Sequence, residues 1–153
     1  MKTKNLIQLV VWLTLCQLPG ILGMQYVFSN MTWYRTLMHP VFTPPEALFG
    51  IVWSILYLTL GVSAFLTFKD KLHTRALLLF VLQLVLNACW TPVFFGAHSL
   101  FGALILIIAM LIALVFLCKA CYPINRAAAW LLMPYGLWLL FATYLTAANW
   151  WLN

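Results

Sequence analysis

The sequence predicts an all-α membrane protein, a bundle of five transmembrane helices with an aromatic, proline-rich loop between the first two. The chain of 153 residues is 66% hydrophobic and 7% charged, whereas soluble domains are about half apolar and about a quarter charged. Its apolar runs are too long for strands and do not alternate with polar residues. A bilayer core about 30 Å thick is crossed by about 20 apolar residues, so five spans fit with little left over.

The five predicted spans follow one another with mostly short connections. We place them at residues 6–27, 46–68, 76–95, 100–120 and 127–150 of a single domain that covers 1–153. The first span follows a basic start, as a secretory signal would. We expect it to be retained, because it is long, is interrupted by Pro19 and Gly20, and lacks a small-residue cleavage site.

Prolines also interrupt the third and fifth spans, at Pro92 and Pro134. Each proline within a span removes an intrahelical hydrogen bond and kinks or opens its helix. Such kinks can simply help irregular helices to pack. They also favour a bundle that bows around a cavity.

The connection 28–45 is the most distinctive segment of the chain. Aromatic residues, a histidine and three prolines crowd it, and it leads directly into an apolar span. Because each proline fixes φ and lacks a backbone donor, the loop is stiff. We expect residues 31–45 to form a lid over an apolar ligand at the mouth of the bundle.

Basic residues are concentrated on one side of the predicted membrane. Positive charge marks the cytoplasmic side, so we expect a cytoplasmic N terminus, with the C terminus and the first loop on the other face. Helical spans favour the inner (cell) membrane of a bacterium. The charges form no continuous stripe, which argues against a nucleic-acid partner. The predicted cytoplasmic side carries Lys2, Lys4, Lys69, Lys71, Arg75, Lys119 and Arg126, and the other side carries Arg35.

Three helix faces combine aromatic rings with polar groups at helical spacing. Their rings suit a flat, conjugated ligand, with each stacking contact adding about 0.5–1.5 kcal/mol beyond area burial. The amides can bind the polar edges of such a ligand, or they can only hold the helices together. A single tryptophan can also belong to an interfacial belt. The face residues are Trp53 and Tyr57 in the second span, Gln83, Asn87, Trp90 and Phe94 in the third, and Tyr135, Trp138 and Ala142 in the fifth.

Hydrolytic and metal chemistry find little support in the sequence. The two carboxylates, Glu46 and Asp70, lie at opposite ends of the second span and cannot form an acid–base pair. The histidines fall in connections, where His39 is better explained as a surface residue than as a haem ligand. The four cysteines show no disulfide framework, and the C-x-x-C spacing of Cys118 and Cys121 lacks the strand–helix context of a redox motif. We therefore expect no metal site, no obligatory cofactor and no hydrolase activity.

Four ordered blocks resemble the TspO/MBR family of tryptophan-rich sensory proteins, translocator proteins and peripheral-type benzodiazepine receptors. The similarity covers nearly the whole chain from Trp33 onward. The blocks are WYRTLMHPVFTPP at 33–45, WSILY at 53–57, QLVLNACWTPVFF at 83–95 and PYGLWLLFATYL at 134–145.

This resemblance implies a five-helix bundle, commonly a homodimer, that binds porphyrins such as protoporphyrin IX, haem-like tetrapyrroles and other flat aromatic molecules. Its pocket would be closed by the first loop. Residues 145–153 lack the tyrosine and basic residue of the cholesterol motif in animal relatives, which argues against cholesterol binding there. Carried over by motif, the lining residues are Tyr34, Pro44, Trp53, Tyr57, Asn87, Trp90, Trp138 and Ala142.

Three functions remain open at this stage. The first is a membrane protein that binds or senses a tetrapyrrole. The second is an enzyme for light- or oxygen-dependent porphyrin breakdown, with Trp53 and Trp138 as the catalytic residues, matching tryptophans implicated in some bacterial relatives. The third is a transporter or transport regulator, although the chain lacks ion-coupling carboxylates and an inverted repeat.

Overall fold

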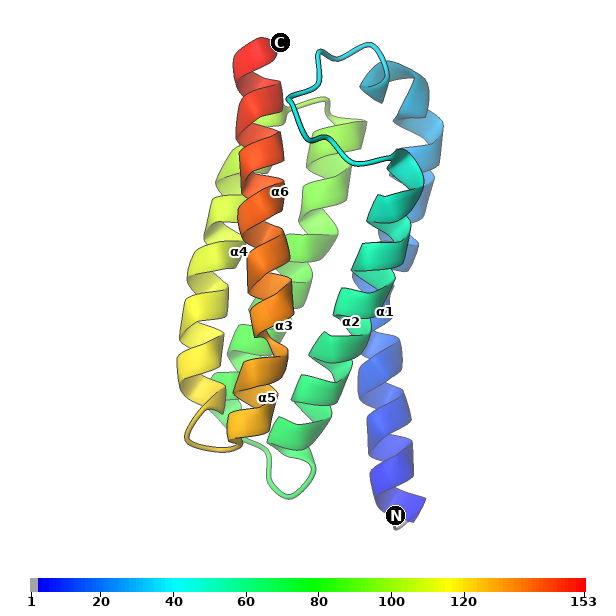
Figure 1. The fold of residues 1–153 in the computed structure, drawn as a ribbon. Coiled ribbons are helices and arrows are strands. Elements are labelled where there is room, and N and C mark those ends of the chain that lie inside the picture. Colours follow the sequence, from blue (N-terminus) through cyan, green and yellow to red (C-terminus); the bar gives the residue numbers. More distant parts are fainter. Residues whose placement is uncertain (1–2) are drawn as a thin grey trace.

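The computed structural model describes residues 3–153, which form a bundle of long helices (Figure 1). Five helical rods are long and apolar enough to cross a membrane, with α3 continuing into η1 and α5 into α6. The predicted fold class and number of spans are therefore confirmed. The elements are α1 (Thr3–Tyr34), α2 (Glu46–Phe68), α3 (Thr74–Thr91), the π-helical turn η1 (Pro92–Gly96), α4 (Leu100–Cys121), α5 (Arg126–Leu131) and α6 (Met133–Leu152).

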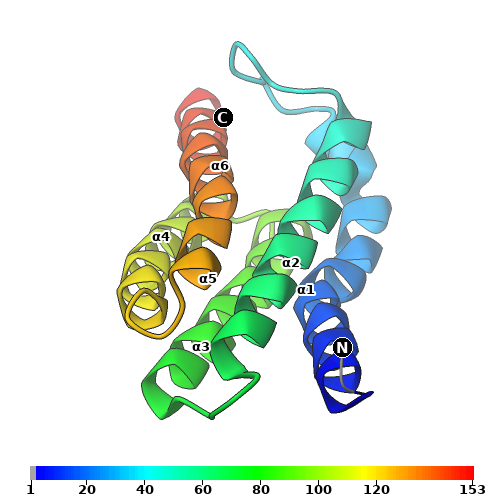
Figure 2. The same cartoon turned by 60° about the horizontal axis from the view of Figure 1, so that its bottom comes forward.

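Most successive helices pack against each other, but α2 packs more closely against α5 than against α3. Helix α1 lies against α2 and α3, α3 lies against α4, and α4 lies against α6. Helices α2 and α6 share few direct contacts, and Figure 2 shows them as separate rods, with the C-terminal end of α6 receding from the viewer. The two ends of the chain lie at opposite ends of the bundle (Figure 1).

The basic connections gather at the end of the bundle where the chain starts (Figure 1). The connections after α2 and after α4 both reach that end, and they hold or adjoin five of the seven cations expected there. Lys4 lies at the start of α1, whereas Lys2 lies outside the described residues. The fold thus keeps the charge asymmetry that the sequence predicts.

The interrupting prolines have different effects on their helices. Pro92 opens the π-helical turn η1, and Pro134 follows a break between α5 and α6 at Leu132. Pro19 lies within α1, whose helical assignment continues past it. Proline therefore interrupts two of the three spans in which the sequence places it.

The first loop is shorter than the predicted connection 28–45. Helix α1 continues to Tyr34, so the loop comprises residues 35–45. Contacts with η1 explain the extra turns, since the Trp33 ring lies edge-on to Phe94 at 5.9 Å and the Tyr34 ring lies 5.6 Å from Phe95. Tyr34 is therefore a residue of the last turn of α1, and the prediction that it belongs to the loop is wrong.

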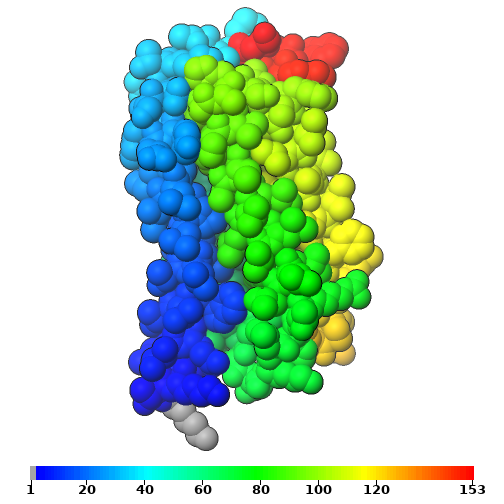
Figure 3. Space-filling view, turned by 180° about the vertical axis from the view of Figure 1, so that it is seen from behind, coloured from blue at the N-terminus to red at the C-terminus, as the bar shows by residue number. Residues whose placement is uncertain are grey.

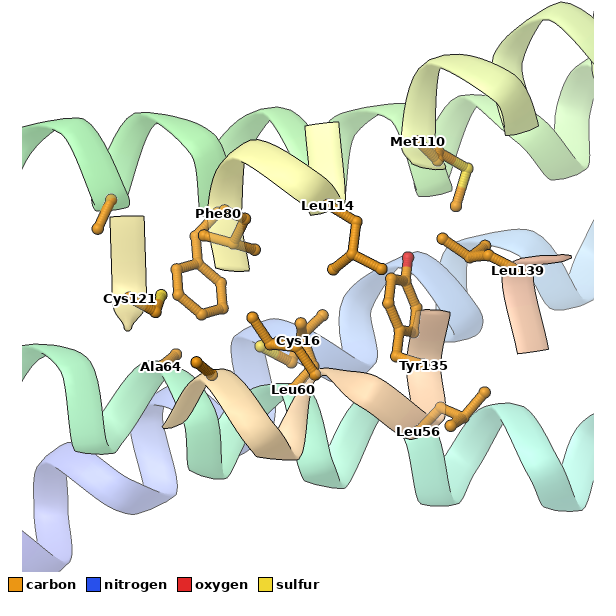
Figure 4. Packing of buried hydrophobic residues seen from close by; sticks show 14 of the residues in the cluster. Cys16, Leu56, Leu60, Ala64, Phe80, Met110, Leu114, Cys121, Tyr135 and Leu139 are labelled. Atoms are coloured by element: carbon orange, nitrogen blue, oxygen red, sulfur yellow. The ribbon is translucent and has the colours of Figure 1, made fainter. Parts of the chain in front are cut away.

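The buried side chains form two hydrophobic clusters. The larger cluster runs along the centre of the bundle, and Figure 4 shows Tyr135 reaching into it toward Leu114 and Leu139. The smaller cluster lies near the first loop and contains Tyr34, Phe94, Phe95 and Ala103. Together they fix the helices that carry the predicted site.

We predict that Gly61→Ala destabilises the bundle by about 1–3 kcal/mol, because overpacking forces the backbone apart. A Cβ atom at Gly61 would lie 2.9 Å from the Leu13 Cα atom, where α1 and α2 meet. The free energy of unfolding in mixed micelles measures the effect. Gly50→Ala is the matched control in the same helix, since its Cβ would meet nothing within 4 Å, and helix propensity should make it neutral or stabilising by up to about 1 kcal/mol. Equal effects of the two substitutions would contradict this packing.

Candidate functional site

A buried hydrogen-bond network joins α2, α3 and α6 at the centre of the bundle. The Tyr57 hydroxyl donates to the Asn87 Oδ1 atom at 2.6 Å. The Tyr135 hydroxyl accepts from Gln83 Nε2 at 2.9 Å and from Asn87 Nδ2 at 3.1 Å. All four side chains are at most 5% exposed. The network consists of four predicted site residues from three different helices.

Aromatic rings line the seam between α2 and α6 beside this network. The Trp53 ring packs against Tyr57 at 5.5 Å and lies edge-on to Tyr135 at 6.1 Å. The Trp138 ring lies edge-on to Phe49 at 6.0 Å. Trp53 and Trp138 are partly buried, while Ala142 is buried one turn beyond Trp138. The seam therefore presents indole faces next to a polar centre.

Several buried polar atoms at and near this seam have no protein partner. They are the Gln83 Oε1 atom and the indole Nε1 atoms of Trp90 and Trp138. An unpaired buried polar group costs about 1–3 kcal/mol, so native structures rarely keep one without a reason. Two indole donors and one amide acceptor can therefore pair with a ligand that has complementary polar atoms.

The remaining predicted residues form a second aromatic group closer to the loop. The Trp90 and Phe94 rings stack at 4.9 Å, and the Tyr34 ring lies 6.2 Å from Phe94. Sequence spacing placed Trp90 and Phe94 on the same face as Gln83 and Asn87. Trp90 lies in α3, three residues after Asn87, and packs against both hydrophobic clusters. Phe94 lies in the π-helical turn that starts at Pro92, which has a different number of residues per turn, so the face does not continue straight past Pro92.

The loop 35–45 is tied down at both sides of the bundle mouth. At its base, the exposed Arg35 guanidinium and Glu46 carboxylate form a two-bond ion pair at 2.9 and 2.7 Å. This hydrogen bonding to Glu46 raises the pKa of Arg35. Pro44 is partly buried in the same loop.

The end of α6 holds the other side of this loop. The Asn153 side chain accepts from the Met38 N–H at 2.9 Å and donates to the Met38 carbonyl at 3.1 Å. The Tyr144 hydroxyl donates to the Val41 carbonyl at 2.9 Å. These contacts connect the loop to the helix that carries Trp138.

The best-defined hollows of the bundle do not coincide with this site. Within residues 3–153, the two best-defined hollows lie away from it, one between α3 and α4 and the other between the connections at the N-terminal end of the bundle. The cavity that the prolines favoured stays a prediction. Residues 3–153 contain no cluster of three or more side chains that could hold a metal ion. That the protein needs no metal stays a prediction.

The sequence profile of the TspO/MBR family matches residues 10–152. The chain belongs to the TspO/MBR family. The match starts within α1, so the similarity extends beyond the blocks recognised from Trp33 onward. This TspO/MBR protein is an integral, multi-pass membrane protein with five spans.

Named relatives come from bacteria, archaea and animals. The tryptophan-rich protein TspO of Archaeoglobus fulgidus is 33% identical over 97% of this chain and 99% of its own length. The translocator protein of Homo sapiens is 34% identical over 84% of this chain and 79% of its own. Protein CrtK of Rhodobacter capsulatus is 29% identical over 94% of this chain and 91% of its own. This TspO/MBR chain therefore belongs to a family of membrane proteins whose members are named as sensory or translocator proteins.

Sequence reasoning missed three residues at the site of this TspO/MBR protein. Phe49 packs against Trp138, and its position one turn before Trp53 could have indicated it. Tyr144 and Asn153 each hydrogen-bond to the backbone of the loop with their side chains. No pattern in the sequence marks such contacts, because they join residues more than 100 positions apart.

We predict that Asn153→Ala loosens the loop without unfolding the bundle. The substitution removes both side-chain hydrogen bonds to Met38. If the free energy of opening of the loop falls by about 1 kcal/mol, amide exchange becomes about fivefold faster. Hydrogen exchange of the segment 36–42, read by mass spectrometry, measures this. Trp151→Ala is the control, because Trp151 lies in the same last turn and is 83% exposed. Unchanged exchange in Asn153→Ala would show that Asn153 does not hold the loop.

Proposed function

We propose that this protein binds a tetrapyrrole such as protoporphyrin IX at the seam between α2 and α6, beneath the loop 35–45. The observation that carries the proposal is the combination of partly buried indole rings with buried, unpartnered polar atoms. Small-molecule sites are mostly apolar and contain a few convergent polar groups. A tetrapyrrole has the matching chemistry, with a wide aromatic face and polar nitrogen and carboxylate atoms.

The residues present suit such a ligand. Trp53 and Trp138 offer ring faces from opposite sides of the seam. The Trp138 N–H can donate to a carboxylate or ring nitrogen, and the Gln83 Oε1 atom can accept from a pyrrole N–H. The bound tetrapyrrole would supply any light-driven or redox chemistry, while the protein positions and shields it.

The sparse contacts between α2 and α6 favour entry of the ligand there. These two helices share few direct contacts, unlike α3 with α4 or α1 with α2. Separating them moves the Trp53 and Trp138 rings apart, and an apolar ligand can then enter from the bilayer. The loop, fastened at Glu46 and Asn153, covers the end of this seam.

The same site suits porphyrin breakdown as a second function. Trp53 and Trp138 both lie at the seam and could donate electrons to an excited tetrapyrrole. Illumination of the bound pigment discriminates between the functions. A new, stoichiometric product that disappears in Trp53→Phe indicates an enzyme, whereas bleaching at the rate seen in free detergent indicates binding alone.

The distribution of charge supports an orientation for this site. We expect the basic end of the bundle to face the cytoplasm of a bacterial cell membrane. The loop 35–45 and the C terminus then face the opposite side. Homodimer formation and action as a receptor stay expectations from the family resemblance.

We predict that Trp138→Phe weakens protoporphyrin IX binding about threefold to tenfold, as expected for the loss of one buried hydrogen bond worth about 0.5–1.5 kcal/mol. Asn87→Ala in the same chain should weaken it further. The shift of the porphyrin absorption band during titration measures affinity independently of tryptophan emission. Trp151→Phe, at an 83% exposed position, is the matched control and should bind normally. Unchanged affinity in the double variant would place the ligand elsewhere.

A further inference from the structure

An apolar groove lies on the membrane-facing side of the bundle between the start of α3 and the end of α4. It has a volume of about 520 Å³ and is lined by Thr74, Arg75, Leu78, Leu79 and Phe116. Figure 3 shows α3 and α4 side by side on this face, in green and yellow. The groove is far from the seam between α2 and α6, and the proposed tetrapyrrole site does not use it.

The polar end of the groove lies at the level of the lipid headgroups. Helix α3 and η1 form a span of 23 residues, Thr74–Gly96, which is about 35 Å long at a rise of 1.5 Å per residue. This length matches a hydrocarbon core of about 30 Å, so Arg75 lies at its boundary. Leu78 and Leu79 follow one turn deeper, at about 5 Å into the acyl region.

Arg75 is an uncompensated charge at this boundary. Its side chain is exposed, and the one ion pair among residues 3–153 joins Arg35 to Glu46 at the other end of the bundle. Lys119 lies one helical turn beyond Phe116 on the same face of α4, toward the same boundary. The groove therefore opens toward positive charge and is apolar below it.

We infer that this groove binds an anionic phospholipid from the leaflet on the N-terminal side of the protein. The Arg75 guanidinium can take two phosphate oxygens in a bidentate contact, and the Thr74 hydroxyl can donate to a third. An acyl chain then lies along Leu78, Leu79 and Phe116. Basic pockets between membrane helices recognise anionic headgroups in this way. A soluble phosphate would leave the apolar part of the groove uncovered.

Native mass spectrometry of the full-length protein in detergent tests the inference with two lipids of equal chain length. We expect phosphatidylglycerol to bind about tenfold more tightly than phosphatidylcholine, and Arg75→Gln to reduce this preference to twofold or less. Arg75→Lys should retain part of it. Phe116→Ala should weaken the binding of both lipids.

Lys71→Gln is the matched control, because it removes the same charge from the same end of the bundle but does not line the groove. It should keep the tenfold preference. Equal losses in Arg75→Gln and Lys71→Gln would overturn the inference, because they would indicate attraction to the overall charge. Displacement of the lipid by millimolar inorganic phosphate would overturn it as well. Porphyrin affinity should be unchanged in Arg75→Gln, so failure here and failure of the tetrapyrrole proposal can be told apart.

Discussion

The hydrogen bonds among Tyr57, Asn87, Gln83 and Tyr135 are the constraint on which the rest of this bundle depends. Between membrane helices there is no strong hydrophobic drive to associate, so packing and polar contacts hold them together. A polar group left unpaired in hydrocarbon costs several kcal/mol. Four such groups, contributed by α2, α3 and α6, are satisfied here mainly by one another. They fix how these three helices are rotated and how closely they approach.

That rotation determines where the aromatic rings of the seam lie. Once Tyr57 faces Asn87, Trp53 lies one turn away at the seam, and Trp138 follows from Tyr135 in the same way. Helix α1 packs closely against the Tyr57 ring at Gly20. A Cβ atom at this position would lie only 2.7 Å from that ring. Within the network, the Gln83 Oε1 atom accepts no hydrogen bond from the protein. The contacts that order the helices are thus also the polar part of the proposed ligand site.

Much of this arrangement could be predicted from the sequence, for identifiable reasons. The amides of Gln83 and Asn87 are rare polar groups within an apolar span, so their spacing of four indicated a buried face. Composition and the distribution of lysine and arginine indicated the spans and the charged end. The end of α1 could not be predicted, because it depends on tertiary contacts between Trp33, Tyr34 and η1. The π-helical turn that carries Phe94 could not be predicted either, because hydrophobic periodicity does not reveal it.

The free energy of unfolding of Tyr135→Phe in mixed micelles tests the central network most directly. The substitution keeps the ring and removes the acceptor shared by Gln83 and Asn87, so we expect a loss of about 1–2 kcal/mol. Tyr122→Phe is the matched control, since Tyr122 is 48% exposed at the end of α4 and should be close to neutral. Wild-type stability in Tyr135→Phe would show that the three helices are held together by other contacts.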